Sequence, residues 1–231
     1  MNRLGHIVRP LAPGQPVRER NTLSLERLVT RRPRHDNLLL FAPPAALSYL
    51  QELVTFLRLE EKITCQPLPP QESLLTRSLA LIRERGPFMR LHVVWEWSGK
   101  APETTRLAWE HYQSMLFEQA SIQPRLIVCR PLFELWILLH EEDPGPWCGD
   151  VAQIQTRMAS LRHLAPEASL LTLTAPRLGV ALKRSQEMAR TRHFETDDDL
   201  LPLQPGTHLH ELILFWHKLA RRDLPEARTV V

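Results

Sequence analysis

The chain has 231 residues, of which 43% are hydrophobic and 24% charged, and its net charge at pH 7 is +3. That length suits one α/β domain with appendages, and the composition is ordinary for a soluble globular protein. There are 8 glycines against 20 prolines and neither a GxGxxG nor a GxxxxGK[ST] loop, which disfavours a P-loop nucleotidase or a dinucleotide-binding protein. Three widely spaced cysteines give no disulfide framework, and no apolar run approaches membrane-spanning length, so we expect a cytoplasmic protein without a membrane partner.

The first 36 residues form a strongly basic segment. Eight arginines stand there against three acids, which gives this segment a charge of +5 and leaves −2 for the rest of the chain. Four prolines and the lack of a sustained apolar period predict an extended arm over residues 1–36. A basic arm suits nucleic acid, with Arg31, Arg32 and Arg34 as candidate phosphate contacts. It equally suits a solubilising tail or docking on an acidic partner.

Beyond the arm, apolar periodicity predicts strands and helices that alternate. Strands are expected over 37–42, 62–68, 91–97 and 126–129, and helices over 44–61, 71–85, 102–120 and 132–140. This alternation is typical of a parallel sheet flanked by helices, so residues 37–145 are expected to form an α/β core. Trp109 and Tyr112 on the third of these helices could stack on bases, although aromatic side chains at helical spacing are more often core.

Residues 146–231 are expected to form a helical region packed on that core. Helices are predicted over 151–164, 176–192 and from Thr207 to about residue 222, with an acidic linker over 194–202. Lys183 and Arg184 make the second of these helices basic, and they are candidate contacts for nucleic-acid phosphates or an acidic partner. A solvated basic face is the alternative interpretation.

One acid interrupts an otherwise apolar stretch, RLIVCRPLFELWILLHEE, over residues 125–142. The pattern predicts a buried strand, Pro131 in the first turn of a helix, and a helix that is apolar nearly all round except for Glu134. A buried carboxylate needs a partner. The favoured partner is the helix N-terminus, whose N–H groups and dipole attract an acid. The alternative is a metal or a catalytic neighbour at the carboxyl end of the strand, where open α/β sheets place their ligands.

The loop over residues 141–150 is acidic. Four acids lie there close to His140 and Cys148, but their spacing matches no known metal cluster, so a solvated loop is favoured.

Two segments carry a family resemblance. Residues 129–140, CRPLFELWILLH, resemble the S-N-P-C-F-E-L-W-L-L-L-H signature of the RloB-like proteins, and residues 204–216, QPGTHLHELILFW, resemble that family's closing N-P-x-T-x-[VI]-x-x-L-V segment. RloB-like proteins are a branch of the Toprim fold found beside ATPase genes in bacterial phage-defence and abortive-infection loci. The resemblance implies a Toprim-like parallel sheet, an antiviral defence role, and an ATPase or another defence effector as partner.

The resemblance also indicates which acids this chain lacks. Toprim proteins carry a glutamate at the end of the first strand, where this chain has Phe41, Ala42 and Pro43. They carry a D-x-D pair at the end of the third strand, where this chain has Glu96 and Ser98. Toprim nucleases hold Mg²⁺ with several such carboxylates. Glu96 and Glu134 are all that remain of the set, and two glutamates would bind the ion weakly.

Three functions follow from these observations as hypotheses. The lost acids favour a degenerate, non-catalytic Toprim-like subunit of an anti-phage complex, with no cofactor or a weakly bound Mg²⁺. The alternative is a divergent Mg²⁺-dependent nuclease in which Glu96 and Glu134 are the catalytic and metal-binding residues, with His140 or Asp143 as further candidates. The third is a module that binds RNA or DNA through the basic arm and the basic helix.

Overall fold

The computed structural model describes residues 37–86, 88–97, 103–164, 166–191 and 205–223, all within one compact unit, His35–Val231. The basic arm with Arg31, Arg32 and Arg34 lies outside the described residues, as do Ser98 and the acidic segment 194–202. Within the described part of the chain, every helix is too short or too polar to cross a membrane.

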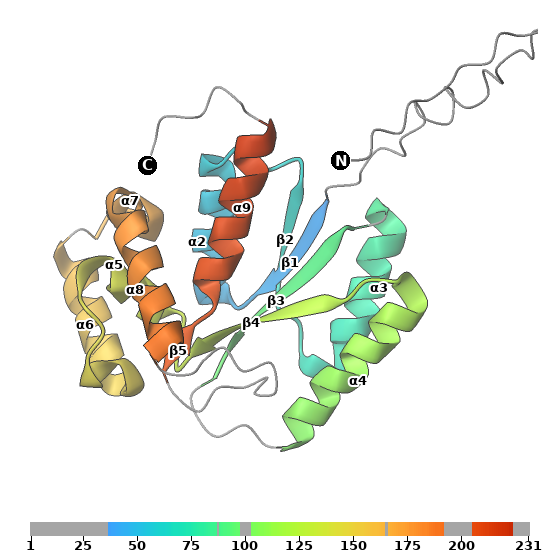
Figure 1. The fold of residues 1–231 in the computed structure, drawn as a ribbon, viewed down its shortest axis with the longest axis horizontal. Coiled ribbons are helices and arrows are strands. Elements are labelled where there is room, and N and C mark those ends of the chain that lie inside the picture. The colour runs from blue at the N-terminus through green and yellow to red at the C-terminus, as the bar shows by residue number, and fades with distance from the viewer. Residues whose placement is uncertain (1–36, 87, 98–102, 165, 192–204, 224–231) are drawn as a thin grey trace, which may run out of the picture. The chain divides into compact units, whose positions relative to one another are not determined.

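One sheet contains all the strands of the described residues (Figure 1). These strands are β1 (Leu38–Ala42), β2 (Ile63–Pro67), β3 (Arg90–Glu96), β4 (Pro124–Arg130) and β5 (Gly206–Thr207), in the spatial order β2-β1-β3-β4-β5. The first four run parallel, whereas β5 is antiparallel to β4. The predicted α/β class is therefore confirmed with one correction. The sheet is mixed rather than wholly parallel, because β5 is antiparallel to β4. The sequence did not predict β5, because a strand of two residues has no apolar alternation that a pattern could reveal.

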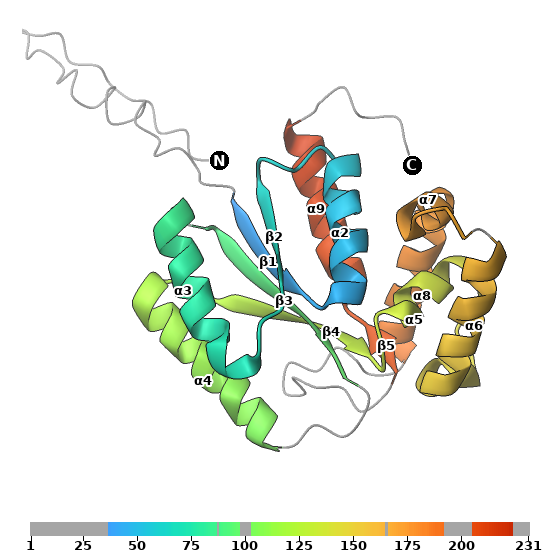
Figure 2. The ribbon, with the colours of Figure 1, turned by 180° about the vertical axis from the view of Figure 1, so that it is seen from behind.

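Helices cover both faces of this sheet. On one face lie α3 (Leu74–Arg85) and α4 (Glu103–Ala120), and on the other lie α2 (Pro44–Phe56) and α9 (Leu209–Asp223) (Figure 1). A further group, α5 (Glu134–Glu141), α6 (Val151–Leu164), α7 (Leu170–Thr174) and α8 (Leu178–Thr191), gathers beside the carboxyl end of β4, as the view from behind also shows (Figure 2). Single 3₁₀ turns are formed by Gln71–Ser73, Pro146–Gly149 and Ala175–Arg177.

Two predicted helices have different ends in the structure, for local reasons. Helix α2 ends at Phe56 rather than near residue 61, because Arg58 takes a left-handed backbone conformation with φ of 56°. Helix α5 begins at Glu134 rather than at residue 132. Pro131 follows a cis peptide bond and precedes the helix, so its predicted place in the first helical turn is wrong.

The segment before α8 also differs from its prediction. The helix expected over 176–192 begins at Leu178, after a 3₁₀ turn over Ala175–Arg177. Helix α7 was not predicted, because it spans only five residues. Ser169 sets its start by accepting a hydrogen bond from the backbone N–H of Thr172 at 3.1 Å.

The alternation of β1 divides the core into two clusters. Leu38, Leu40 and Ala42 belong to a large cluster with α2, α5 and α9, which defines the first face of the sheet. Leu39 and Phe41 belong to a smaller cluster with α3 and α4, which defines the second face. All five residues of β1 are buried, as expected for the inner strand of a sheet covered on both sides.

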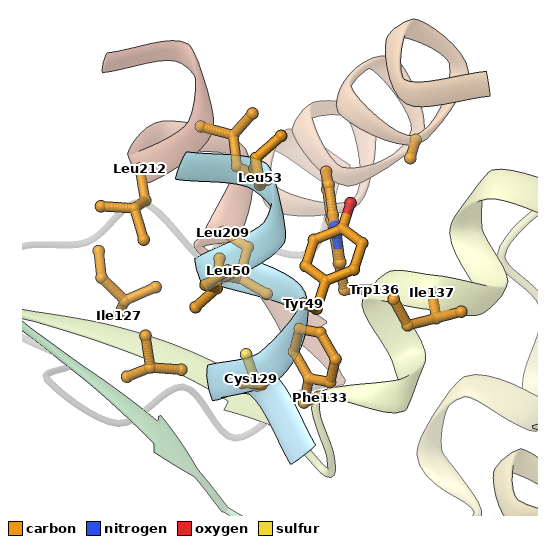
Figure 3. Packing of buried hydrophobic residues seen from close by; sticks show 14 of the residues in the cluster. Tyr49, Leu50, Leu53, Ile127, Cys129, Phe133, Trp136, Ile137, Leu209 and Leu212 are labelled. Atoms are coloured by element: carbon orange, nitrogen blue, oxygen red, sulfur yellow. The ribbon is translucent and has the colours of Figure 1, made fainter. Parts of the chain in front are cut away.

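Large rings fill the first face. Tyr49 from α2 packs against Phe133, with ring centroids 5.6 Å apart, and Trp136 from α5 lies beside them (Figure 3). Trp136 and Trp216 are fully buried. Helix α5 is thus part of the core on nearly every side, as its sequence predicted.

Candidate functional site

The carboxyl ends of β1, β3 and β4 lie next to one another, because β3 pairs with both of the other strands. Glu96 is the last residue of β3 and pairs with Cys129, and α5 begins at Glu134 shortly after β4. The structure therefore brings the two predicted glutamates to the same edge of the sheet. This edge is where open α/β sheets bind ligands.

The carboxylate of Glu96 binds the start of α5. Its Oε1 accepts a hydrogen bond from the backbone N–H of Phe133 at 3.0 Å. Phe133 is the residue before the helix, so Glu96 satisfies an N–H group at the helix terminus from a distant strand. Glu96 is thereby a capping side chain, a role that sequence reasoning missed because the two residues lie 37 positions apart.

Burial raises the pKa of the Glu96 carboxyl. Desolvation is the main cause, the hydrogen bond from Phe133 opposes it, and the negative charge of Glu134 adds to it. The charge of Glu134 is thus felt at Glu96, although burial and the Phe133 hydrogen bond have the larger effects on its pKa. A cation placed between the two carboxylates would relieve their repulsion, so this pair is the candidate metal site of the described residues.

Glu134 occupies the first turn of α5 and is half-buried. The prediction that this acid lies at a helix N-terminus is confirmed. The positive end of the helix dipole favours a carboxylate there by about 0.3–1 kcal/mol. Because the helix itself stabilises this charge, the position of Glu134 does not require a metal.

The other candidates for the acidic site lie elsewhere. His140 is buried near the far end of α5, where its Nδ1 lies 3.0 Å from the Trp136 carbonyl oxygen. Burial lowers the pKa of His140 to about 4. Asp143 accepts a hydrogen bond from Arg184 at 2.7 Å. His140 and Asp143 therefore do not join Glu96 and Glu134 in one cluster, and within the described ranges no group of three or more His, Cys, Asp or Glu side chains is arranged to hold an ion.

The end of β1 carries no ionisable side chain, because Ala42 is its last residue. Ala42 is buried, and its carbonyl oxygen accepts a hydrogen bond from the N–H of Leu68 at 2.8 Å. Cys129, on β4, is fully buried with its Sγ 3.4 Å from the Thr207 hydroxyl. Burial raises the pKa of the Cys129 thiol to about 12, which disfavours the thiolate that a nucleophile needs.

The basic helix α8 meets the acidic loop after α5. Arg184 donates to Asp143 and also to the Leu139 carbonyl oxygen at 2.9 Å, and its side chain is only 19% exposed. Its guanidinium is thus engaged within the fold, whereas Lys183 is exposed to solvent.

Two more ion pairs of the same kind, Arg177–Glu141 and Arg157–Glu142, join this loop to its neighbouring helices. Three of the loop's four acids are thus paired with arginines, while Asp143 and Asp150 remain exposed, as expected for a solvated loop. Exposed ion pairs of this type contribute up to about 1 kcal/mol each.

No protein-family model, curated protein or solved structure matches the chain.

Proposed function

We propose that this chain is an RloB-like protein with a degenerate Toprim-like core, acting as a non-catalytic subunit of a bacterial anti-phage complex. Support comes from the two segments that carry the family resemblance. They are distant in sequence but pack together: Cys129 pairs with Thr207, and the N–H of His208 donates to the Val128 carbonyl oxygen at 2.9 Å. Two resembling segments that jointly form one part of the core are better support than either segment alone.

The lack of a catalytic acid set is the observation that carries the non-catalytic role. Ala42 ends β1 where Toprim proteins have a glutamate, and the carboxylate of Glu96 at the end of β3 is held by the start of α5. Hydrolysis of a phosphodiester by Mg²⁺ needs carboxylates free to hold the ion and a further group to move a proton. Two glutamates, one of them engaged as a cap, supply too little for that chemistry.

The proposed partner is an ATPase or another defence effector, with RNA or DNA as a second possibility through the basic arm and Lys183. The test is a pull-down from the native host with a C-terminal tag, in which both proteins and nucleic acids are identified. Recovery of a stoichiometric ATPase or effector supports the subunit role. Nuclease activity of the pure protein with Mg²⁺ or Mn²⁺, abolished in Glu134→Ala, would overturn it.

The proximity of Glu96 and Glu134 favours a second candidate, a divergent Mg²⁺-dependent nuclease. Mg²⁺ is commonly bound by one or two carboxylates together with substrate phosphates, so the pair could hold an ion once a nucleic acid is bound. Calorimetry with Mg²⁺ and Mn²⁺, with and without a short RNA or DNA duplex, tests this. The absence of heat at millimolar metal in every combination would count heavily against the nuclease.

A further inference from the structure

A cavity lies on the second face of the sheet, opposite the pair Glu96 and Glu134. It has a volume of about 440 Å³ and lies between the start of α3, with the 3₁₀ turn before it, and the first half of α4, against Trp95 of β3 and Leu126 of β4. Both helices begin at the carboxyl edge of the sheet, so the cavity opens at the edge where parallel sheets bind ligands. Its volume falls within the roughly 300–1,000 Å³ of typical small-molecule sites.

The inner wall of this cavity is apolar. Leu75, Ala108 and Leu126 line it together with the rings of Trp95 and Trp109. The indole Nε1 of Trp109 is covered by protein atoms, so only carbon atoms of this side chain can contact a ligand in the cavity. A ligand that fills the cavity therefore needs an apolar body without polar atoms on its inner side.

The aromatic wall is fixed in place. Trp109 packs on Tyr112 with ring centroids 5.2 Å apart, and the Tyr112 hydroxyl lies 2.9 Å from the Ser78 hydroxyl. Because the Tyr112 hydroxyl is hydrogen-bonded to α3, it is engaged and the ring is held against both helices. Because Trp109 and Tyr112 are buried, they support the wall from behind, and the half-buried Trp95 is the ring on which a flat ligand can stack without reorganising the protein.

The rim of the cavity is polar and carries both charges. Glu72 and His111 lie there, and Arg106 is paired with Glu110. Glu72 and Glu110 against Arg106 give these rim residues a net charge of −1, so the rim disfavours an anion and offers hydrogen-bonding groups to an uncharged ligand. It therefore suits one polar group rather than a charged one.

We propose that this cavity binds a small, flat, uncharged aromatic molecule that carries a polar group at one end. This site is separate from the glutamate pair, because Trp95 and Glu96 are consecutive in a strand and point to opposite faces of the sheet. It does not rest on the proposed role in phage defence. A ligand bound here would contact the ends of β3 and β4, next to the start of α4.

The test uses 2-naphthol as the probe, because it has a flat apolar body and one hydroxyl. Naphthalene-2,6-disulfonate is the matched control, with the same body and a charge at both ends. For a molecule of this size we expect a Kd of about 0.1–1 mM for 2-naphthol. In methyl-labelled full-length protein, its shifts should be confined to Leu75, Ala108 and Leu126, and the disulfonate should bind at least about tenfold more weakly.

Substitution of the wall locates the site. Ala108→Phe places a ring in the cavity and should weaken 2-naphthol binding by at least about tenfold. Ala159→Phe, at an exposed position of α6, should leave binding unchanged. The methyl shifts of the wild-type protein decide the question if Ala108→Phe does not fold. Shifts spread over exposed apolar residues such as Met89 and Val180, equal affinity for the two naphthalenes, or unaltered binding to folded Ala108→Phe would each overturn the proposal.

Discussion

The two faces of the sheet are built differently. The first face, under α2, α5 and α9, is closed by large rings such as Tyr49, Phe133 and Trp136, each at most 1% exposed. The second face, under α3 and α4, has a smaller cluster and leaves a cavity of about 440 Å³. Protein interiors are normally packed as densely as organic crystals. The comparison therefore separates a face that stabilises the fold from a face with room for a ligand.

The strongest test of this difference removes a ring from the first face. Trp136→Ala should lower the free energy of unfolding by about 3–5 kcal/mol, because the surrounding core cannot collapse into the space. Urea denaturation measures the change. Phe56→Ala is the control, since that ring is 57% exposed and its loss should change stability by less than about 1 kcal/mol. Similar losses for the two variants would show that the first face is not a closed core.

The second prediction uses a buried histidine on the first face. His92 is 3% exposed, and desolvation, helped by Arg125 and Arg90, lowers its pKa from 6.5 to about 4. The unfolded chain therefore binds a proton at higher pH than the folded chain does. His92 therefore has no effect on the free energy of unfolding well above pH 6.5. As the pH falls from 6.5 towards 4, protonation of the unfolded chain lowers the free energy of unfolding by about 3 kcal/mol at most.

The variant His92→Phe removes that titration, so its free energy of unfolding should fall less steeply between pH 6.5 and 4. Denaturation curves at half-unit pH steps measure the slope. The same substitution at the exposed His163 is the control and should leave the slope as it was. An unchanged slope in His92→Phe would mean that His92 is not the buried titrating group.

The third prediction makes one substitution on both faces. Ala46 is fully buried in the first face, so Ala46→Leu should destabilise the protein by about 1–3 kcal/mol through overpacking. Ala108 lines the cavity of the second face, so Ala108→Leu has space and should change stability by no more than about 1 kcal/mol. Thermal unfolding of the two variants side by side gives the answer. Equal destabilisation would mean that the cavity is filled in solution.

The smallest effects are expected at Glu96. Its raised pKa means that the charged form destabilises the fold above that pKa and that this cost disappears as the pH falls through it. Glu96→Gln removes the charge but keeps an acceptor for the Phe133 N–H, so it should stabilise the protein by up to about 1 kcal/mol at pH 7. Glu96→Ala removes the acceptor and should destabilise it by about 1 kcal/mol.

Calorimetric unfolding of these two variants, with and without 5 mM Mg²⁺ (about the concentration at which a weak site fills), separates the cap from a metal site. A capping role predicts the same difference between the variants in both buffers. Stabilisation of the wild type by Mg²⁺ that both variants lose would instead favour the nuclease alternative.

The sequence reveals those features that depend on neighbouring residues. The apolar run Leu38–Ala42 predicts a buried strand, and Glu134 at the start of an apolar helix predicts an acid at a helix terminus; both are confirmed. Features that join distant residues were not predictable. The cap from Glu96 to Phe133 spans 37 positions, and the pair of Asp143 with Arg184 spans 41. Periodicity carries no information about such partners.

The difference in packing between the two faces of the sheet also could not be predicted from the sequence. Trp109 and Tyr112 have the helical spacing of core residues, and both are buried. Their spacing gives no sign that the cluster they join is incomplete. Whether a cluster closes depends on the side-chain volumes that several elements bring together, which only the assembled sheet decides.

The short antiparallel strand β5 affects how the chain folds while it is being synthesised. Thr207 reaches Cys129 of β4 across 78 positions, so β4 is synthesised long before the strand that pairs with its outer edge. An unpaired edge is a template for aggregation, and contacts between distant residues form slowly. The segment around β5 and α9 can therefore cover this edge only after synthesis has passed residue 206, and nascent chains that stall earlier should be the most prone to aggregate.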